Sequence, residues 1–333
     1  MRSIEPRADA DHIMNIVRGV LSDTSANPFT YQGPSQAQII SGEEESVYKW
    51  VALNYLEGVL DEDSVNKQTY GVMEMGGGSL QIAFLPERQP LAEEYAVTLA
   101  GRKFSLYVHS YLGYGSNGIV ERMTDDLDDG TVDGSVDLVK TNPCFLLKDT
   151  KTMTLTTGET VKYIGSGNAD LCKDSIVSQT TYSDLRDYDD YCHPGPCAIF
   201  NTYQPEISQS MPFYAMGGFQ YALEDFDLLN DDMTFDDIPL LGNKSSEYCP
   251  LTVDKAKAQL PGKPEQFLSN TCLLGEYVQI VLGDRGLGPF GPNVKVTSKV
   301  KGVSAEWTLG ALVVHQYEKL SGVESARNFG YGR

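Results

Sequence analysis

Positive charge is scarce in this sequence. Its 333 residues include 26 lysine and arginine side chains against 46 aspartate and glutamate side chains, so the formal net charge is -20. Nucleic acids and anionic membranes attract positively charged surfaces, and we therefore expect neither as a partner. Long apolar runs are also missing, so we expect no membrane anchor within this chain, although a longer form could carry one.

Zinc ligands are scarce too. The chain has four histidines, and none of its six cysteines belongs to a C-x-x-C pair, which argues against a zinc site. An even number of cysteines favours disulfide bonds, which form in an oxidising compartment such as the extracellular space or the lumen of the secretory pathway. Spacing alone does not decide how they pair. The cysteines all lie in the second half of the chain: Cys144, Cys172, Cys192, Cys197, Cys249 and Cys272.

Two further features bear on the compartment. Asn243 opens an Asn-Lys-Ser sequence, the acceptor pattern for N-glycosylation in secreted proteins. No signal peptide opens the chain, because residues 1–11 are polar and charged. We therefore expect a secreted glycoprotein whose natural N-terminus lies upstream of Met1.

The most informative stretch is rich in glycine. An apolar run, residues 70–75, leads into Gly76, Gly77 and Gly78, and a second apolar run, residues 80–85, follows. This pattern predicts a strand, a tight turn and a second strand. Without Cβ atoms, the backbone N–H groups of the turn can approach another group closely and form a concave site for phosphate. A turn whose glycines serve only the geometry of a hairpin is the alternative.

Polar side chains flank this turn. Glu74 precedes it, and Ser79 and Gln81 follow it. One carboxylate, one hydroxyl and one amide are therefore expected near the same small site.

A helix is predicted over residues 43–60, where apolar residues recur at steps of three and four. Ser41 and Glu44 stand three residues apart and match a capping box, which leaves Glu45 free in the first turn. The helix dipole favours an ionised carboxylate at that place. From these residues alone, the preferred interpretation of Glu45 is a solvated charge that offsets the dipole.

The rest of the chain alternates strand and helix patterns, which is typical of an α/β protein. Residues 211–229 begin with aromatic residues and continue with helical spacing. Other expected helices are residues 8–23, 272–282 and 306–320, and other expected strands are residues 36–40, 96–100, 104–109, 153–156 and 294–297.

Four stretches resemble the conserved regions of one family, in the same order. Residues 40–56 resemble its third region, and residues 73–81 resemble its fourth. Residues 213–221 and 307–310 resemble the two parts of its fifth region. The family is that of the apyrases, or nucleoside triphosphate diphosphohydrolases (nucleoside phosphatases), and the resemblance extends over about residues 10–317.

The resemblance implies an α/β fold of the actin/hexokinase (RNase H-like) type, with two related domains and an active site between them. Residues 1–39 would be a remnant of the first domain, and residues 40–304 the second domain with its disulfide-bearing loops. Residues 305–333 would form a C-terminal helix that returns to the first domain. The resemblance also implies that most of the first domain is missing from this chain, including the family's Asp-x-Gly-Ser/Thr phosphate loop, because Met1-Arg2 resembles the end of the family's second conserved region.

The activity that the resemblance implies is metal-dependent hydrolysis of the terminal phosphate of nucleoside tri- and diphosphates. By its position, Glu45 is the general base that activates the attacking water, in place of the solvated charge preferred above. Ser79 and Gln81 hold that water and the hydration shell of the metal. Gly76–Gly78, together with Ser79, form a phosphate-binding loop.

The same resemblance implies a Ca²⁺ or Mg²⁺ ion that is held through water molecules. Glu74, where the family usually has aspartate, and Trp50 stand on the metal side of the site. Phe219 or Tyr221 would stack on the nucleobase, and the sequence does not decide between them. Ser304 is a further departure, because the family has aspartate at that position.

For the cysteines, the family pattern implies the pairs Cys144–Cys172, Cys192–Cys197 and Cys249–Cys272. Two other functions stay open. A catalytically inactive or truncated member would act as a binding module, which the missing phosphate loop and Glu74 favour. A related phosphatase would act on polyphosphate or guanosine tetraphosphate, which the cysteines and the aromatic segment argue against.

Overall fold

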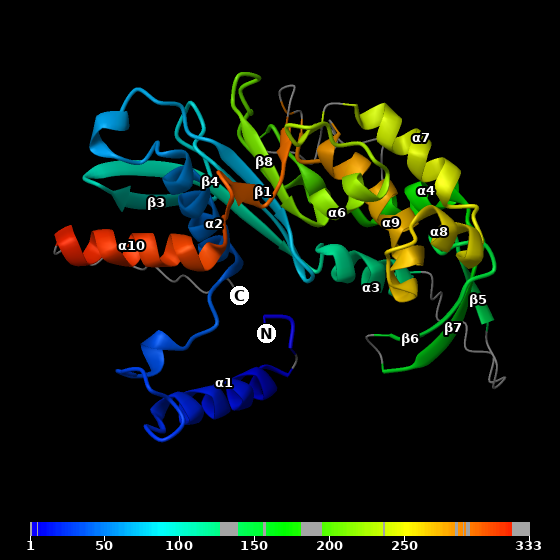
Figure 1. Cartoon of the computed structure of the whole chain (residues 1–333), viewed down its shortest axis with the longest axis horizontal. Helices are drawn as coiled ribbons and strands as arrows, with labels where there is room; N and C mark the ends of the chain where they lie inside the picture. The colour runs from blue at the N-terminus through cyan, green and yellow to red at the C-terminus, as the bar shows by residue number, and fades with distance from the viewer. Residues whose placement is uncertain are drawn as a thin grey trace.

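The computed structural model describes residues 2–4, 6–126, 139–155, 158–180, 195–235, 237–283, 286–288, 290 and 294–321. A mixed sheet of seven strands runs through its middle, with helices on both faces (Figure 1). The strands are β1 (Gly71–Met75), β2 (Ser79–Phe84), β3 (Glu94–Leu99), β4 (Arg102–Leu112), β8 (Phe213–Gly217), β9 (Thr234–Phe235) and β10 (Val294–Val296). Their order across the sheet is β3-β4-β2-β1-β8-β10-β9.

The glycine-rich stretch forms the predicted hairpin at the centre of this sheet. β1 and β2 pair antiparallel, with Glu74 opposite Gln81 and Met75 opposite Leu80. β1 pairs in parallel with β8, and β8 pairs in parallel with β10. The hairpin therefore joins the parallel centre of the sheet to its antiparallel side, which β4 and β3 complete.

Helices connect and flank these strands. The α-helices of the described residues are α1 (Arg7–Ser22), α2 (Gly42–Glu57), α3 (Ser116–Asp126), α4 (Ala169–Thr180), α6 (Gly218–Asp225), α7 (Ile238–Tyr248), α8 (Val253–Gln259), α9 (Glu265–Leu282) and α10 (Trp307–Ser321). The 3₁₀ turns are Pro34–Gln36, Glu62–Ser64 and Ile199–Asn201. A small sheet of three strands contains β5 (Val139–Asn142), β6 (Thr150–Thr154) and β7 (Thr160–Gly165). A second small sheet pairs β11 (Lys299–Val300) with β12 (Val303–Ser304).

Each face of the central sheet has its own apolar core, because alternate residues of a strand point to opposite faces. Met73 and Ile82 belong to the larger core, which lies under α6 and α9. Val72 and Ala83 belong to the smaller core, which α2 and α10 cover (Figure 1). Gln81 stands two residues before Ala83, so its side chain points to the α2 face.

α10 packs along α2 with unusually close backbones. A Cβ atom at Gly310 would collide with the carbonyl oxygen of Tyr48, so only glycine permits this approach. The C-terminal helix is thereby held against the helix that carries Glu45. The return of residues 305–333 to a first domain stays a prediction.

Most expected elements are confirmed, and one is wrong. The helices expected over residues 8–23 and 306–320 match α1 and α10. The strand expected over residues 36–40 does not form, because no strand pairs with this segment. The carbonyl oxygen of Ala37 instead accepts a hydrogen bond of 3.0 Å from the Arg18 side chain.

Two of the expected disulfide bonds are present. Cys144 is bonded to Cys172 and Cys249 to Cys272, and each bond joins an α-helix to a segment packed against it. Cys192 lies outside the described residues, so the third pair stays a prediction. Among the described residues, we find no helix with the length and apolar character that a membrane span requires.

Candidate active site

The first turn of α2 sets the position of Glu45. The Ser41 hydroxyl accepts a hydrogen bond of 3.1 Å from the Glu44 N–H group, and the Glu44 carboxylate accepts one of 3.1 Å from the Ser41 N–H group. This arrangement confirms the predicted capping box. Gly42 lets the turn lie directly on β4, because a Cβ atom there would collide with the Ser110 side chain. Glu45 is thus presented to the hairpin strands.

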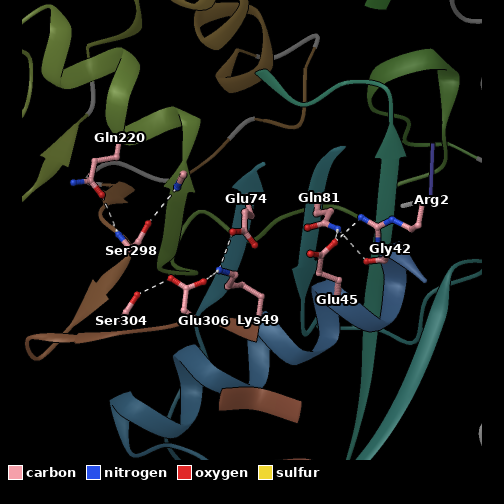
Figure 2. A network of polar contacts seen from close by, with 11 residues as sticks. Arg2, Gly42, Glu45, Lys49, Glu74, Gln81, Gln220, Ser298, Ser304 and Glu306 are labelled. Carbon is pink, nitrogen blue, oxygen red and sulfur yellow. Dashed lines mark hydrogen bonds and ion pairs between the residues drawn. The ribbon is translucent and has the colours of Figure 1, made fainter. Parts of the chain in front are cut away.

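One carboxylate oxygen of Glu45, Oε2, makes two short polar contacts. Gln81 Nε2 donates to Oε2 of Glu45 at 2.7 Å, and Arg2 Nη2 forms an ion pair with the same oxygen at 2.5 Å. The same Arg2 nitrogen donates to the Ser79 hydroxyl at 3.1 Å. Figure 2 shows Arg2, Gln81 and Glu45 meeting at this point. No described residue donates to Oε1 of Glu45, so the second oxygen is left for water or a ligand.

Hydrogen bonds to its carbonyl groups fix the position of the glycine turn. The N–H groups of Ser116 and Asn117, at the start of α3, donate to the carbonyl oxygens of Gly76 and Gly77 at 2.8 and 2.9 Å. Gly77 and Gly78 are exposed, and no described residue accepts a hydrogen bond from their N–H groups. These two neighbouring N–H groups are therefore available as hydrogen-bond donors to a ligand.

Glu74 is held by a lysine. Lys49 Nζ lies 2.8 Å from Oε1 of Glu74 and 3.4 Å from Oε2 of Glu306 (Figure 2). The Ser304 hydroxyl donates to the other oxygen of Glu306 at 2.7 Å. Burial raises the pKa of the Glu74 carboxyl, and the Lys49 ammonium opposes that rise. Lys49 therefore supplies the counter-charge that a buried carboxylate requires.

One oxygen of Glu74 is paired with a cation, and the other has no partner in the described part of the chain. Its Oε1 contacts the Lys49 ammonium group, whereas its Oε2 is buried without a hydrogen-bond partner among the described residues. Within the described ranges, no group of three or more histidine, cysteine, aspartate or glutamate side chains is arranged to hold a metal. Lys49, Glu74 and Gln81 line one narrow hollow. The Ca²⁺ or Mg²⁺ ion expected from the resemblance stays a prediction.

The aromatic residues expected near the ligand differ in their exposure. Trp50 and Phe219 are fully buried, whereas Tyr221 is 64% exposed. Trp50 lies in the smaller core, with its ring centre 5.4 Å from that of Phe104, and its indole nitrogen has no hydrogen-bond partner in the part of the chain that the structure describes. Of the two residues considered for the nucleobase, only Tyr221 offers an accessible ring. Asn243 is exposed on α7, and its glycosylation stays a prediction.

Sequence reasoning identifies neither Arg2 nor Lys49 as a contact of the site carboxylates. Lys49 stands four residues after Glu45 and so lies on the same face of α2, which is a signal that the sequence contains. Arg2 has no such signal, because it contacts Glu45 from 43 residues away.

Comparison with known proteins gives a consistent set of similarities. The model of the GDA1/CD39 (nucleoside phosphatase) family matches residues 1–323. Bovine (Bos taurus) ectonucleoside triphosphate diphosphohydrolase 1 is 26% identical over 332 residues, which cover 90% of this chain and 61% of the bovine protein. An Arabidopsis thaliana protein named Probable apyrase 3 is 26% identical over 319 residues, which cover 91% of this chain and 62% of that protein. This chain thus spans about three fifths of the length of these curated relatives.

The fold has a counterpart among solved structures. The crystal structure of nucleoside triphosphate hydrolases from Neospora caninum matches with a TM-score of 0.60 and 16% sequence identity. The match covers 93% of this chain and 70% of that chain. The expected actin-like α/β fold is thereby confirmed.

Proposed function

The chain belongs to the GDA1/CD39 (nucleoside phosphatase) family, and on this premise we propose that the protein hydrolyses the terminal phosphate of nucleoside tri- and diphosphates. The observation that carries the proposal is the meeting of Glu45 with the glycine hairpin. Arg2 Nη2 contacts both the Glu45 carboxylate and the hydroxyl of Ser79, the residue that directly follows the glycines. A carboxylate with one open oxygen therefore stands beside a turn with free N–H groups.

In this mechanism Glu45 is the general base. Gln81 and Arg2 hold Oε2, and Oε1 takes a proton from a water molecule while the water oxygen attacks the terminal phosphorus. The bond from that phosphorus to the bridging oxygen breaks, and the shortened nucleotide leaves with the bond's electron pair. The N–H groups of Gly77 and Gly78 stabilise the charge on the phosphate oxygens.

Exposure supports Tyr221 as the residue that stacks on the nucleobase. A ring must offer a free face for stacking, and Tyr221 does so, whereas Phe219 is part of the larger core. Replacement of Tyr221 by alanine would then raise KM for nucleotides without a matching loss of kcat.

We also propose that the protein works outside the cytosol. Two disulfide bonds among the described residues support an oxidising compartment, and one relative carries the name ectonucleoside triphosphate diphosphohydrolase. Glycosylation of Asn243 belongs to this proposal. The division into residues 1–39, 40–304 and 305–333 is likewise proposed.

The decisive test compares Glu45→Gln with Glu43→Gln. Both residues lie in the first turn of α2, but only Glu45 contacts Arg2 and Gln81. We expect Glu45→Gln to lower kcat for phosphate release from ATP and ADP by about 10²- to 10⁴-fold, because the general base is lost. Glu43→Gln should stay within about twofold of wild type, since it contacts no site residue.

Two results would contradict the proposal. Equal hydrolysis by wild type and Glu45→Gln would remove Glu45 from the chemistry. A wild-type protein that binds ATP, as measured by calorimetry, but releases no phosphate would instead support the inactive binding module.

A further inference from the structure

A buried ammonium group occupies the part of the site where a metal ion is expected. The side chain of Lys49 is 2% exposed, and its Nζ contacts the carboxylates of Glu74 and Glu306 at 2.8 and 3.4 Å (Figure 2). Lys49 belongs to α2, Glu74 to β1, and Glu306 directly precedes α10. Three elements of the fold thus meet at one positive charge.

Lys49 cannot serve as a direct contact for a phosphate in this arrangement. With 2% of its side chain exposed, the ammonium faces the carboxylates and not the solvent. Its effect on a ligand must therefore act through the charge and the hydrogen-bonding capacity of Glu74.

We propose that Lys49 is a built-in counter-ion that replaces a divalent cation as the partner of Glu74. The ammonium uses Oε1 of Glu74 and cancels its charge, so a second cation near this carboxylate would meet a positive charge already in place. Glu306 adds a second negative charge, but its side chain is 55% exposed, so solvent screens its attraction for a cation. Glu74 consequently contributes little to the binding of divalent cations.

This inference deepens the proposed function, because it concerns the charge at the same site, but it does not depend on hydrolysis. A purely structural salt bridge is the competing explanation. That role predicts a loss of stability on removal of Lys49 and no change in cation binding. The proposal predicts that removal of Lys49 frees Glu74 for a cation.

The test is Mn²⁺ binding to the nucleotide-free protein, followed by electron paramagnetic resonance of free Mn²⁺. The variants are Lys49→Met, Lys49→Arg, Glu74→Gln and the double variant Lys49→Met/Glu74→Gln. Lys301→Met is the matched control, because it removes the same charge from a different place. The Lys301 ammonium contacts Glu57 at 3.5 Å, at the C-terminal end of α2 and away from Glu74.

We expect Lys49→Met to bind Mn²⁺ at least about tenfold more tightly than wild type, since a unit charge in contact with the site is removed. Lys49→Arg and Lys301→Met should stay within about twofold of wild type, and the double variant should lose the gain. Glu74→Gln in the wild-type background should change Mn²⁺ affinity by less than about twofold, because any cation that the wild-type protein binds is held away from this carboxylate, where solvent screens the change in charge.

Three results would overturn the proposal. They are unchanged affinity in a folded Lys49→Met protein, an equal gain in Lys301→Met, and a loss of more than about tenfold in Glu74→Gln alone. Should Lys49→Met fail to fold, a loss of more than about tenfold in Glu74→Gln alone would still overturn the proposal. All of these measurements are made without nucleotide, so failure of the proposed hydrolysis would not affect them.

Discussion

Glu45 and Glu74 stand on the same face of the hairpin, and each is paired with one cation, but the two cations are held differently. The two glutamate side chains are similarly exposed, at 24% and 20%, although Oε2 of Glu74 is buried. Their partners are not, because the Arg2 side chain is 23% exposed and that of Lys49 is 2% exposed. The difference between the two halves of the site therefore lies in the cations.

This difference assigns different roles to the two carboxylates. Arg2 reaches Glu45 from a distant segment and bridges it to Ser79, which leaves Oε1 of Glu45 open. Lys49 comes from the next turn of the same helix and holds Glu74 from the protein interior. Glu45 is arranged to accept a proton from outside, whereas Glu74 is arranged as half of an internal ion pair.

The largest expected difference between the halves is in stability. Lys49→Met leaves Glu74 without its counter-charge in a buried place, and we expect a loss of about 3 kcal/mol in the free energy of unfolding. Arg2→Met breaks a partly exposed pair and should cost less than about 1 kcal/mol. Urea unfolding at pH 7.5 measures both, and equal losses would show that the two pairs are alike.

A second prediction concerns the glycine turn, which depends on backbone contacts and not on charge. A Cβ atom on Gly115 would lie 2.5 Å from both the Gly76 carbonyl oxygen and the Ser79 nitrogen. Gly115→Ala should therefore displace the turn, cost about 1–3 kcal/mol of stability and lower phosphate release roughly 10²-fold.

Gly78→Ala is the matched control, since a Cβ atom there would meet nothing within 4 Å. We expect it to change stability by less than about 0.5 kcal/mol. A loss of stability equal to that of Gly115→Ala would mean that the turn tolerates no added atom at either place. Thermal unfolding and phosphate release, measured on the same preparations, separate these outcomes.

The hairpin and the main helices were predictable because their signals are local. Two apolar runs around Gly76–Gly78 predict a strand, a turn and a strand, and Ser41 with Glu44 predicts the start of α2. The strand predicted over residues 36–40 was wrong because a short apolar run matches the pattern of a strand, whereas a strand also requires a paired neighbour that the local sequence does not reveal.

The candidate site was less predictable, because its contacts join distant parts of the chain. The helix dipole explains Glu45 as a solvated charge, and only the family resemblance pointed to it as a base. The pair of Lys49 and Glu74 joins a helix to a strand, and Arg2 contacts Glu45 across 43 residues. Propensity and periodicity describe neighbours along the chain and carry no information on such pairs.

A third carboxylate provides a reference for the comparison, because it is buried without an ammonium in contact. Glu276 is 1% exposed, and burial raises its pKa from 4.5 to about 6, although the nearby Ser245 hydroxyl and the charge of Lys173 oppose the rise. The native state therefore binds the proton more tightly than the unfolded chain. Protonated Glu276 therefore stabilises the native state fully below pH 4.5, and this stabilisation is lost as the pH rises through about 6.

Glu276→Gln should accordingly stabilise the protein by about 2 kcal/mol at pH 7.5 and make no difference near pH 4.5. Urea unfolding of both proteins between these two pH values measures the effect. A constant difference across the range would exclude titration of Glu276 as its cause.

The smallest expected effect separates the two contacts of Lys49. Glu306 is 55% exposed and 3.4 Å from Nζ, whereas Glu74 is 20% exposed and 2.8 Å away. Solvent screens the contact between Lys49 and Glu306. The hydrogen bond from the Ser304 hydroxyl lowers the pKa of Glu306 more than the charge of Lys49 does. Glu306→Gln should therefore cost less than about 0.5 kcal/mol in urea unfolding. A loss of unfolding free energy close to that of Lys49→Met would mean that Glu306, and not Glu74 alone, is needed to stabilise the Lys49 ammonium.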